Sequence, residues 1–199
     1  MPKCPGQDKY YWTPDDVYDV ACPACGDPVE FFKTDPMRRC PSCGYASPNP
    51  RLDAGCAQWC PHAELCVGVK LAGAAEDEAG TVRLVDRLLA AARDRLGRDR
   101  GQIVRSLQTL QQAQQALAGE PEADPRVVLA AAVLLDASED TAAHADVMRG
   151  AGFDDATIQR VAALLGPGGL EGSSPEARVL RQVALSLSAP GPAAPHALQ

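Results

Sequence analysis

The sequence lacks an apolar run long enough to cross a membrane. A spanning helix needs roughly 18 or more consecutive apolar residues, and no segment of the 199 residues reaches that length. The first twenty residues, MPKCPGQDKYYWTPDDVYDV, also lack the apolar core of a secretory signal peptide. We therefore expect a cytoplasmic protein with no membrane partner.

The sequence also lacks an excess of positive charge. Its 19 Lys and Arg stand against 26 Asp and Glu, for a net charge of -7, which argues against a general nucleic-acid binder. One local exception is a segment with three aspartates and seven arginines: Arg83, Arg87, Arg93, Arg95, Arg98, Arg100 and Arg105. Arginine suits bidentate contacts with phosphate, so nucleic-acid or nucleotide binding is an alternative to the favoured interpretation, a solvated helix face.

Residues 67–199 contain no cysteine, whereas the first third of the chain contains eight. In a reducing compartment, clustered thiols indicate metal ligands more than disulfides. The composition therefore predicts four segments: a Cys-rich module at 1–70, a linker at 71–80, a helical domain at 81–188 and a disordered tail at 189–199.

Two Cys-x-x-Cys-Gly motifs, CPACG and CPSCG, predict the first metal site. Two such motifs hold four thiolates tetrahedrally around one ion, and the glycine permits a left-handed turn. The ligands of this zinc site are Cys22, Cys25, Cys40 and Cys43. Between the motifs, residues 29–32 favour a β-strand and Asp35-Pro36 a turn, so the segment resembles the hairpin of a zinc ribbon.

The other four cysteines predict a second site with less regular spacing. CAQWCPHAELC contains three thiols, and one more lies near the N-terminus; the set is Cys4, Cys56, Cys60 and Cys66. This site could hold zinc or an iron-sulfur cluster, and only iron would make a redox role relevant. His62 could replace Cys4 as a ligand, and some of these thiols could instead be buried and free.

Metal is expected to fold the Cys-rich module, which has few large apolar residues. A structural zinc site contributes an apparent free energy on the order of 10 kcal/mol. Four thiolates leave no open position for a water molecule on the ion. We therefore expect structural sites that do not catalyse hydrolysis.

The rest of the chain favours six helices and shows no strand signal. They begin at or near Thr81, Ile103, Asp124, Asp140, Asp154 and Ser173. Thr81, Asp124 and Asp154 are candidate N-caps, and Ser173 has the capping-box spacing to Glu176. The helix after Asp124 is apolar nearly all round, so it should be the most buried.

These segments resemble bacterial HD-domain phosphohydrolase homologues that carry an N-terminal zinc-ribbon module. The resemblance rests on CPGQD, YYWTPDDVYDV, CPACGDPVEFFK, RRCPSCG, NPRLDAGCAQWCPHAELC and DPRVVLAAAVLLD, and it extends over residues 3–187. It implies an all-α HD-like domain after the ribbon. It also implies a metal-dependent phosphohydrolase site, in which histidines and aspartates hold ions that activate water.

Matched residue by residue, most of those implied ligands are absent. The early histidine falls at Arg105, and the His-Asp pair at Leu135-Asp136 keeps only its aspartate. The later histidine-rich stretch matches residues 165–168, and the last aspartate falls near 182–184. Asp136 is therefore interpreted as a structural carboxylate, a vestige of the HD site that could pair with Arg105.

The favoured interpretation is a zinc-binding protein with a catalytically inactive HD-like domain that binds a protein or a small phosphorylated ligand. The chain's histidines are His62, His144 and His196, and we expect His144 on an exposed helix face. A phosphohydrolase with an unmatched site is the other alternative. Its candidate residues are Glu139, Asp140, His144, Asp154 and Asp155.

Overall fold

The structure is a computed structural model that describes residues 10, 12–52, 75–97, 99–135 and 141–188. Two antiparallel hairpins form a β module at residues 12–52, and six α-helices follow in the described part of the chain. The helices, referred to below as the helical module, are α2 (Ala75–Leu96), α3 (Arg100–Leu117), α4 (Pro125–Leu134), α5 (Thr141–Ala151), α6 (Asp155–Leu165) and α7 (Pro175–Ser188).

The β module consists of two hairpins that each enclose one Cys-x-x-Cys-Gly motif. A short 3-10 turn (Pro14–Asp16) leads into β1 (Val17–Ala21), which pairs with β2 (Pro28–Phe32). β3 (Met37–Arg39) pairs in the same way with β4 (Ala46–Pro48). The strand expected at residues 29–32 is therefore confirmed, but its partner is β1, ahead of the first motif. The sequence interpretation assigned no strand to β1 or β4.

Asn49 ties the two hairpins together. Its Oδ1 accepts a hydrogen bond of 2.5 Å from the hydroxyl of Tyr18 on β1. Its Nδ2 donates to the carbonyls of Phe32 and Asp35, at 3.2 and 2.9 Å. Few large side chains fill this module's interior, and Phe31 on β2 is the largest that is fully buried. Hydrogen bonds of this kind matter because the apolar core of the β module is small.

Helix α4 is the centre of the helical module. It contacts α2, α3, α6 and α7, and all eight of its residues from 127 to 134 are buried. Its start follows the expected chemistry, because the carboxylate of Asp124 accepts from the backbone N–H of Arg126 at 2.9 Å and Pro125 is the first helical residue. The prediction that this helix is the most buried is confirmed.

Three helix starts differ from the sequence interpretation. Helix α3 begins at Arg100, with Asp99 as its N-cap, three residues before the expected Ile103. Helix α2 begins at Ala75, inside the segment assigned to the linker, so Thr81 is a buried interior residue and no N-cap. At α7 the hydroxyl that caps the helix belongs to Ser174, which accepts from the N–H of Ala177 at 3.1 Å. The expected cap, Ser173, is one residue too early. The N-cap at Asp154 and the end of α2 at Gly97, in a left-handed conformation, are as expected.

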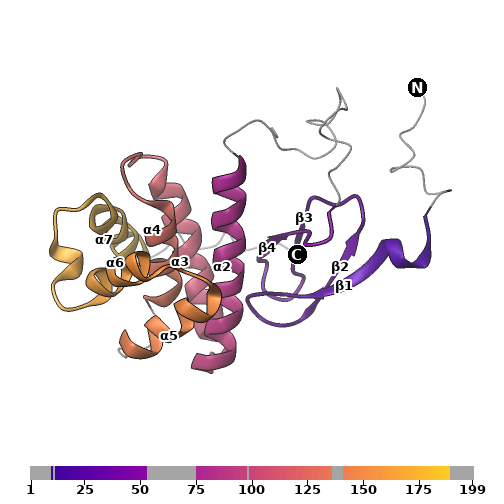
Figure 1. Ribbon diagram of the computed structural model, residues 1–199, viewed down its shortest axis with the longest axis horizontal. Coiled ribbons are helices and arrows are strands. Elements are labelled where there is room, and N and C mark those ends of the chain that lie inside the picture. The colour runs from indigo at the N-terminus through magenta and orange to yellow at the C-terminus, as the bar shows by residue number, and fades with distance from the viewer. Residues whose placement is uncertain (1–9, 11, 53–74, 98, 136–140, 189–199) are drawn as a thin grey trace, which may run out of the picture.

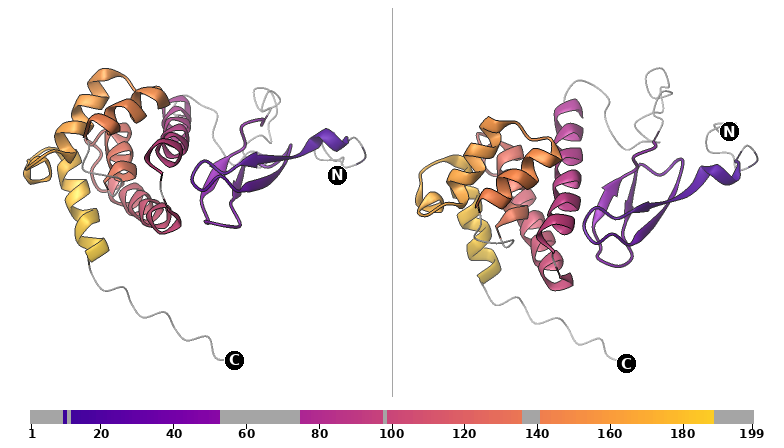
Figure 2. Two further views of the ribbon diagram at one scale, coloured as in Figure 1. Left: turned by 90° about the horizontal axis from the view of Figure 1, so that it is seen from below. Right: turned by 60° about the horizontal axis from the view of Figure 1, so that its bottom comes forward.

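Helix α2 lies between the β module and the other helices (Figures 1 and 2). One face, with Val85, Leu88, Leu89 and Ala92, is buried in the core that α2 shares with the helical module. The flanking face, with Asp86 and Arg93, meets the hairpins that carry the cysteines. The buried apolar residues of both modules belong to one cluster, in which Cys22 and Cys40 join the helical side chains.

None of the helices in the described part of the chain combines the length and the apolar content that crossing a membrane requires.

Candidate metal centre

The first Cys-x-x-Cys-Gly motif, residues 22–26, forms a closed loop that we call the first knuckle. The N–H of Gly26 donates to the carbonyl of Cys22 at 2.8 Å, and the N–H of Cys22 donates to the carbonyl of Asp27 at 2.8 Å. Gly26 has φ +84°, a left-handed conformation that favours glycine. The loop therefore presents Cys22 and Cys25 on the same side of the hairpin end.

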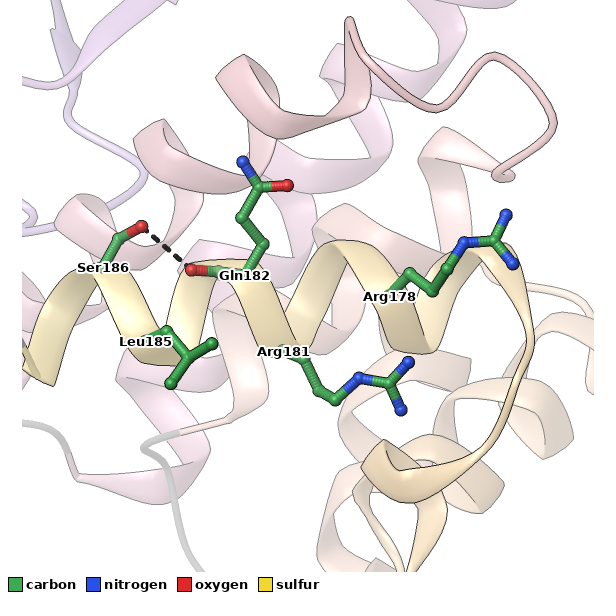
Figure 3. Close-up of a pocket in the computed structure, with 5 residues that line it drawn as sticks. All are labelled: Arg178, Arg181, Gln182, Leu185 and Ser186. Atoms are coloured by element: carbon green, nitrogen blue, oxygen red, sulfur yellow. Dashed lines mark hydrogen bonds between the residues drawn. The ribbon is translucent and has the colours of Figure 1, made fainter.

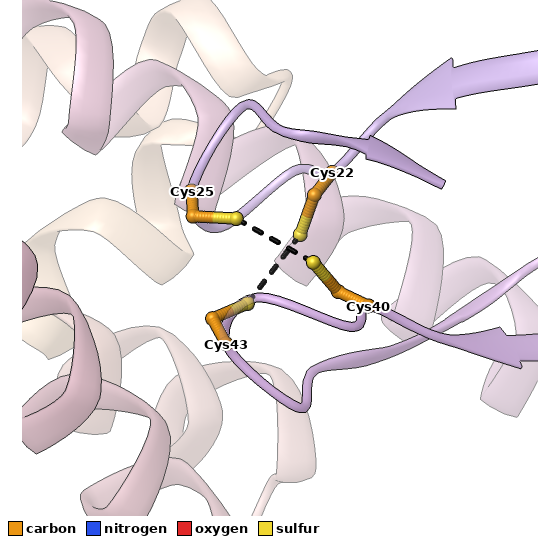
Figure 4. Close-up of side chains that lie close together, drawn as sticks. All are labelled: Cys22, Cys25, Cys40 and Cys43. Carbon is orange, nitrogen blue, oxygen red and sulfur yellow. Dashed lines mark hydrogen bonds between the residues drawn. The ribbon is translucent and has the colours of Figure 1, made fainter. Parts of the chain in front are cut away.

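The second knuckle, residues 40–44, repeats this geometry. The N–H of Gly44 donates to the carbonyl of Cys40 at 2.9 Å, and the N–H of Cys40 donates to the carbonyl of Tyr45 at 2.8 Å. Gly44 has φ +76°. The two knuckles face each other, and the four cysteine side chains point toward a common centre (Figure 4).

The four sulfur atoms fit a single tetrahedral ion. All of them lie within 4.8 Å of one another. The Sγ atoms of Cys22 and Cys43 are 3.6 Å apart, as are those of Cys25 and Cys40. A tetrahedron with zinc-sulfur bonds of ~2.3 Å has sulfur-sulfur edges of ~3.8 Å, close to these distances. The predicted first site is thus brought together at a place where a zinc ion could bind.

Burial and nearby N–H groups together set the pKa values of these thiols. Burial raises the pKa of the Cys25 thiol to about 11 and raises that of Cys43 further. Burial also acts to raise the pKa of Cys40, but the N–H groups of Cys43 and Ser42 outweigh it, and the pKa falls to about 7. Ligation requires thiolates, so an ion must displace protons from this cluster.

Two arginines of the helical module bind the backbone of the knuckles. Arg93 on α2 donates through Nη1 to the carbonyl of Cys22 at 2.9 Å and to that of Pro23 at 3.4 Å. Arg100, the first residue of α3, donates to the carbonyl of Ser42 in the second knuckle at 2.9 Å. Each knuckle therefore receives one guanidinium from outside the β module.

A third contact joins the second knuckle to α2. The hydroxyl of Tyr45 donates to Oδ1 of Asp86 at 2.7 Å. Burial raises the pKa of the Asp86 carboxyl, and the Tyr45 hydroxyl partly offsets this rise. Burial and the nearby carboxylate also raise the pKa of Tyr45. A carboxylate in this position costs free energy unless the phenol remains bonded to it.

The sequence interpretation did not find this contact between the modules. It counted Arg93 and Arg100 only as parts of an arginine-rich segment, and it gave no role to Tyr45 or Asp86. Asp86 and Arg93 are seven residues apart, which places them on one helix face two turns apart. That spacing was visible, but local sequence patterns do not reveal partners about 40 to 70 positions away.

The arginine-rich segment provides internal contacts. Besides Arg93 and Arg100, Arg95 donates to the carbonyl of Asp146 on α5 at 3.1 Å. Three of the seven guanidiniums therefore bind backbone carbonyls of the same chain. Arg83 and Arg105 are exposed, and Arg98 lies outside the described residues.

Several predicted site residues cannot be placed. The second cysteine set, Cys4, Cys56, Cys60 and Cys66, lies outside the described residues, and so do His62, Asp136, Glu139 and Asp140. Among the described residues, the four knuckle cysteines are the one group of three or more Cys, His, Asp or Glu able to share an ion. Arg105, which the sequence interpretation matched to the early histidine of an HD site, is exposed on α3.

The expectation for His144 is wrong. Its exposed fraction is only 5%, because it lies on the side of α5 that also carries the buried Val147 and Met148, three and four positions later. Two other candidates have structural roles. Asp154 caps α6 by accepting from the N–H of Thr157 at 2.8 Å, and Asp155 lies 3.8 Å from Nε of Arg149.

A shallow hollow of about 550 Å³ lies along α7 (Figure 3). Two of its lining residues are arginines, but both bind groups of the protein. Arg178 forms an ion pair of 2.8 Å with Glu120, and Arg181 donates to the carbonyls of Leu170 and Gly172 at 2.6 and 2.7 Å. The knuckles are therefore the stronger candidate site.

Comparison of the chain with protein-family models, with curated proteins and with solved structures finds no match. The resemblance to HD-domain phosphohydrolases consequently stays a prediction from the sequence.

Proposed function

We propose that this protein binds one zinc ion through Cys22, Cys25, Cys40 and Cys43, and that the β module is a zinc ribbon. The observation that supports this most directly is the convergence of four Sγ atoms within 4.8 Å from two matching knuckles. A soft, all-thiolate tetrahedron selects zinc or iron over magnesium and calcium. Four protein ligands leave no position open for water, so the ion's role is structural.

Elemental analysis of protein purified without a metal-binding tag tests this proposal. The double variant Cys25→Ser/Cys43→Ser removes one ligand from each knuckle and should contain one zinc ion fewer per chain than the wild type. The variant Ser42→Ala changes the second knuckle without touching a ligand and should retain the wild-type zinc content. Equal zinc content in the double variant and the wild type would show that the proposal is wrong.

The same measurement addresses the second cysteine set. We propose that Cys4, Cys56, Cys60 and Cys66 hold a second ion, with zinc and an iron-sulfur cluster as the alternatives. The support is the count of four thiols and the spacing of three of them in CAQWCPHAELC. Iron with a visible charge-transfer absorption would identify a cluster, and two zinc ions per wild-type chain would identify a second zinc site.

We further propose that the helical module is an HD-like domain without catalytic activity, which serves binding to a protein or a small phosphorylated ligand. The support is chemical: Arg105 and Leu135 occupy positions where the family places metal-ligating histidines, and a guanidinium repels a cation while an alkyl group cannot ligate one. Phosphatase assays with magnesium, manganese, cobalt and iron should show no turnover. Metal-dependent hydrolysis that survives removal of the knuckle thiols would contradict this proposal.

A further inference from the structure

We propose that the metal centre holds the β module onto helix α2, so that metal binding and docking of the two modules are a single coupled event. Arg93, Arg100 and the Tyr45–Asp86 pair form the docking surface. This inference depends on the proposed zinc site, and it assigns to that site a partner within the chain. Three features of the structure carry it.

The first feature is the identity of the groups that the arginines bind. The carbonyl of Cys22 accepts from the N–H of Gly26 at 2.8 Å, which closes the first knuckle, and also from Arg93 at 2.9 Å. A carbonyl oxygen has two lone pairs, so both bonds can form together. Arg93 therefore binds the backbone of a predicted ligand in the conformation that closes the metal site.

The second feature is an asymmetry between two otherwise matching knuckles. A Cβ atom built on Gly26 would lie 3.2 Å from Nη1 of Arg93, whereas one built on Gly44 would have no neighbour within 4 Å. Both glycines share the left-handed conformation that the knuckle requires. Only Gly26 also permits close approach of a guanidinium, so the first knuckle is shaped for contact with α2.

The third feature is the path from the second knuckle to α2. The carbonyl of Tyr45 accepts from the N–H of Cys40 at 2.8 Å, and its hydroxyl donates to Asp86 at 2.7 Å. Tyr45 thus connects a predicted ligand to α2 through its own backbone and side chain. If the knuckle opened, the Asp86 carboxylate would lose this donor while still partly covered by protein.

The charges of the metal centre and of the two arginines also favour coupling between metal binding and docking on α2. A divalent ion held by four thiolates is a dianionic centre, and Arg93 and Arg100 bring a cation to each knuckle. Hydrogen bonds from charged donors are stronger than neutral ones, and those from Arg93 and Arg100 strengthen further beside a negative centre. Because coupling between two equilibria is reciprocal, docking on α2 must tighten metal binding by the same factor as metal strengthens docking.

This reciprocity provides the test, since the hydrogen bonds of Arg93 to the first knuckle go to the carbonyls of Cys22 and Pro23. Zinc affinity is measured on the full chain by competition with a chelator. The affinity compared is that of the knuckle site, which is identified as the zinc ion missing from the Cys25→Ser/Cys43→Ser variant. Arg93→Ala should weaken zinc binding by about 10-fold, which is the effect of losing one charged hydrogen bond, and Arg100→Ala should weaken it in the same direction. Arg149→Ala is the matched control, because this arginine pairs with Asp146 on its own helix.

Hydrogen exchange gives a second measurement that does not depend on affinity. Removal of zinc from the wild type should increase exchange both in residues 22–26 and along α2 from residue 85 to 96. In Arg93→Ala with zinc bound, exchange should increase in residues 22–26. Circular dichroism confirms that each variant keeps its helices.

The outcomes separate this inference from the proposed function. If the wild type and the Cys25→Ser/Cys43→Ser variant contain equal zinc, the metal site itself is wrong and the coupling fails with it. If the site binds zinc but Arg93→Ala and Arg100→Ala retain wild-type affinity, the zinc proposal stands and the coupling is wrong. Weaker zinc binding in both variants, with Arg149→Ala unchanged, supports the coupling.

Discussion

Arg93 and Cys22 are 71 positions apart in the sequence, yet the guanidinium of one donates a 2.9 Å hydrogen bond to the carbonyl of the other. This bond joins helix α2 of the helical module to a predicted metal ligand of the β module. It makes the β module part of the same packed structure as the helices and not an independent appendage.

The two knuckle glycines provide a matched comparison. Gly26→Ala and Gly44→Ala each place a Cβ on a left-handed residue, which costs about 1–2 kcal/mol. At Gly26 the new methyl would also lie 3.2 Å from Nη1 of Arg93, so the guanidinium must shift by a few tenths of an ångström and strain its hydrogen bond to Cys22. We expect Gly26→Ala to be about 1 kcal/mol more destabilising, the value of a typical hydrogen bond. Chemical denaturation of the zinc-loaded variants measures the difference, and equal losses would contradict the contact.

Tyr45→Phe should lower the free energy of unfolding by about 1–3 kcal/mol, because it leaves the covered Asp86 carboxylate without the phenol donor. Asp86→Asn should cost less, since the amide oxygen still accepts from Tyr45 and no charge is buried. A double-mutant cycle over these two positions, followed by thermal or chemical unfolding, measures their coupling. Strictly additive effects would indicate that the 2.7 Å bond contributes nothing to docking.

Acid should weaken the helical module through Glu176. Burial acts to raise the pKa of Glu176, but the N–H groups of Glu176 and Asp124 and the charge of Arg160 outweigh it, so the pKa lies below its ordinary value of 4.5. A depressed carboxyl pKa stabilises the fold above pH 4.5, and this stabilisation disappears as the pH falls through the folded-state pKa.

Unfolding curves recorded between pH 3 and 7 test the role of Glu176. Glu176→Gln should reduce stability at neutral pH and flatten the decline below about pH 4.5. The exposed Glu171 serves as the control, and Glu171→Gln should change stability at neutral pH less than Glu176→Gln does. A wild-type decline that persists unaltered in Glu176→Gln would assign the acid sensitivity to other groups.

Zinc affinity at the knuckles should rise steeply with pH. The pKa of Cys25 is raised to about 11 and that of Cys43 is also raised, so near neutral pH an ion must displace at least these two protons. Affinity should then increase by at least about 100-fold per pH unit. Chelator competition at pH 6.5, 7.0 and 7.5 measures this slope. A slope below tenfold per unit would mean that these thiols are not both ligands.

Much of the helical module could be predicted because its signals are local. Asp124-Pro125 and Asp154 start helices through side-chain and φ preferences that depend only on neighbouring residues. Gly97 ends α2 for a similar reason, since glycine adopts a left-handed conformation without strain. The apolar run after Asp124 predicts burial on every side, and α4 is buried from 127 to 134.

The predictions that failed concern choices between similar local signals. Thr81 has the chemistry of an N-cap, but α2 extends back to Ala75, through a sequence whose acidic residues favour a helix start. Ser173 and Ser174 are equivalent as caps until the path of the backbone is known. His144 looked exposed because its burial depends on which side of α5 packs inward.

The sequence by itself determined the two Cys-x-x-Cys-Gly knuckles of the candidate metal site and most of the helices, because motif spacing and helix periodicity are local signals. Only the tertiary structure decided that the site rests on α2. The contacts of Arg93 with Cys22 and of Asp86 with Tyr45 join positions 71 and 41 apart. Such contacts form when two folded surfaces meet, and their geometry depends on the whole chain between them.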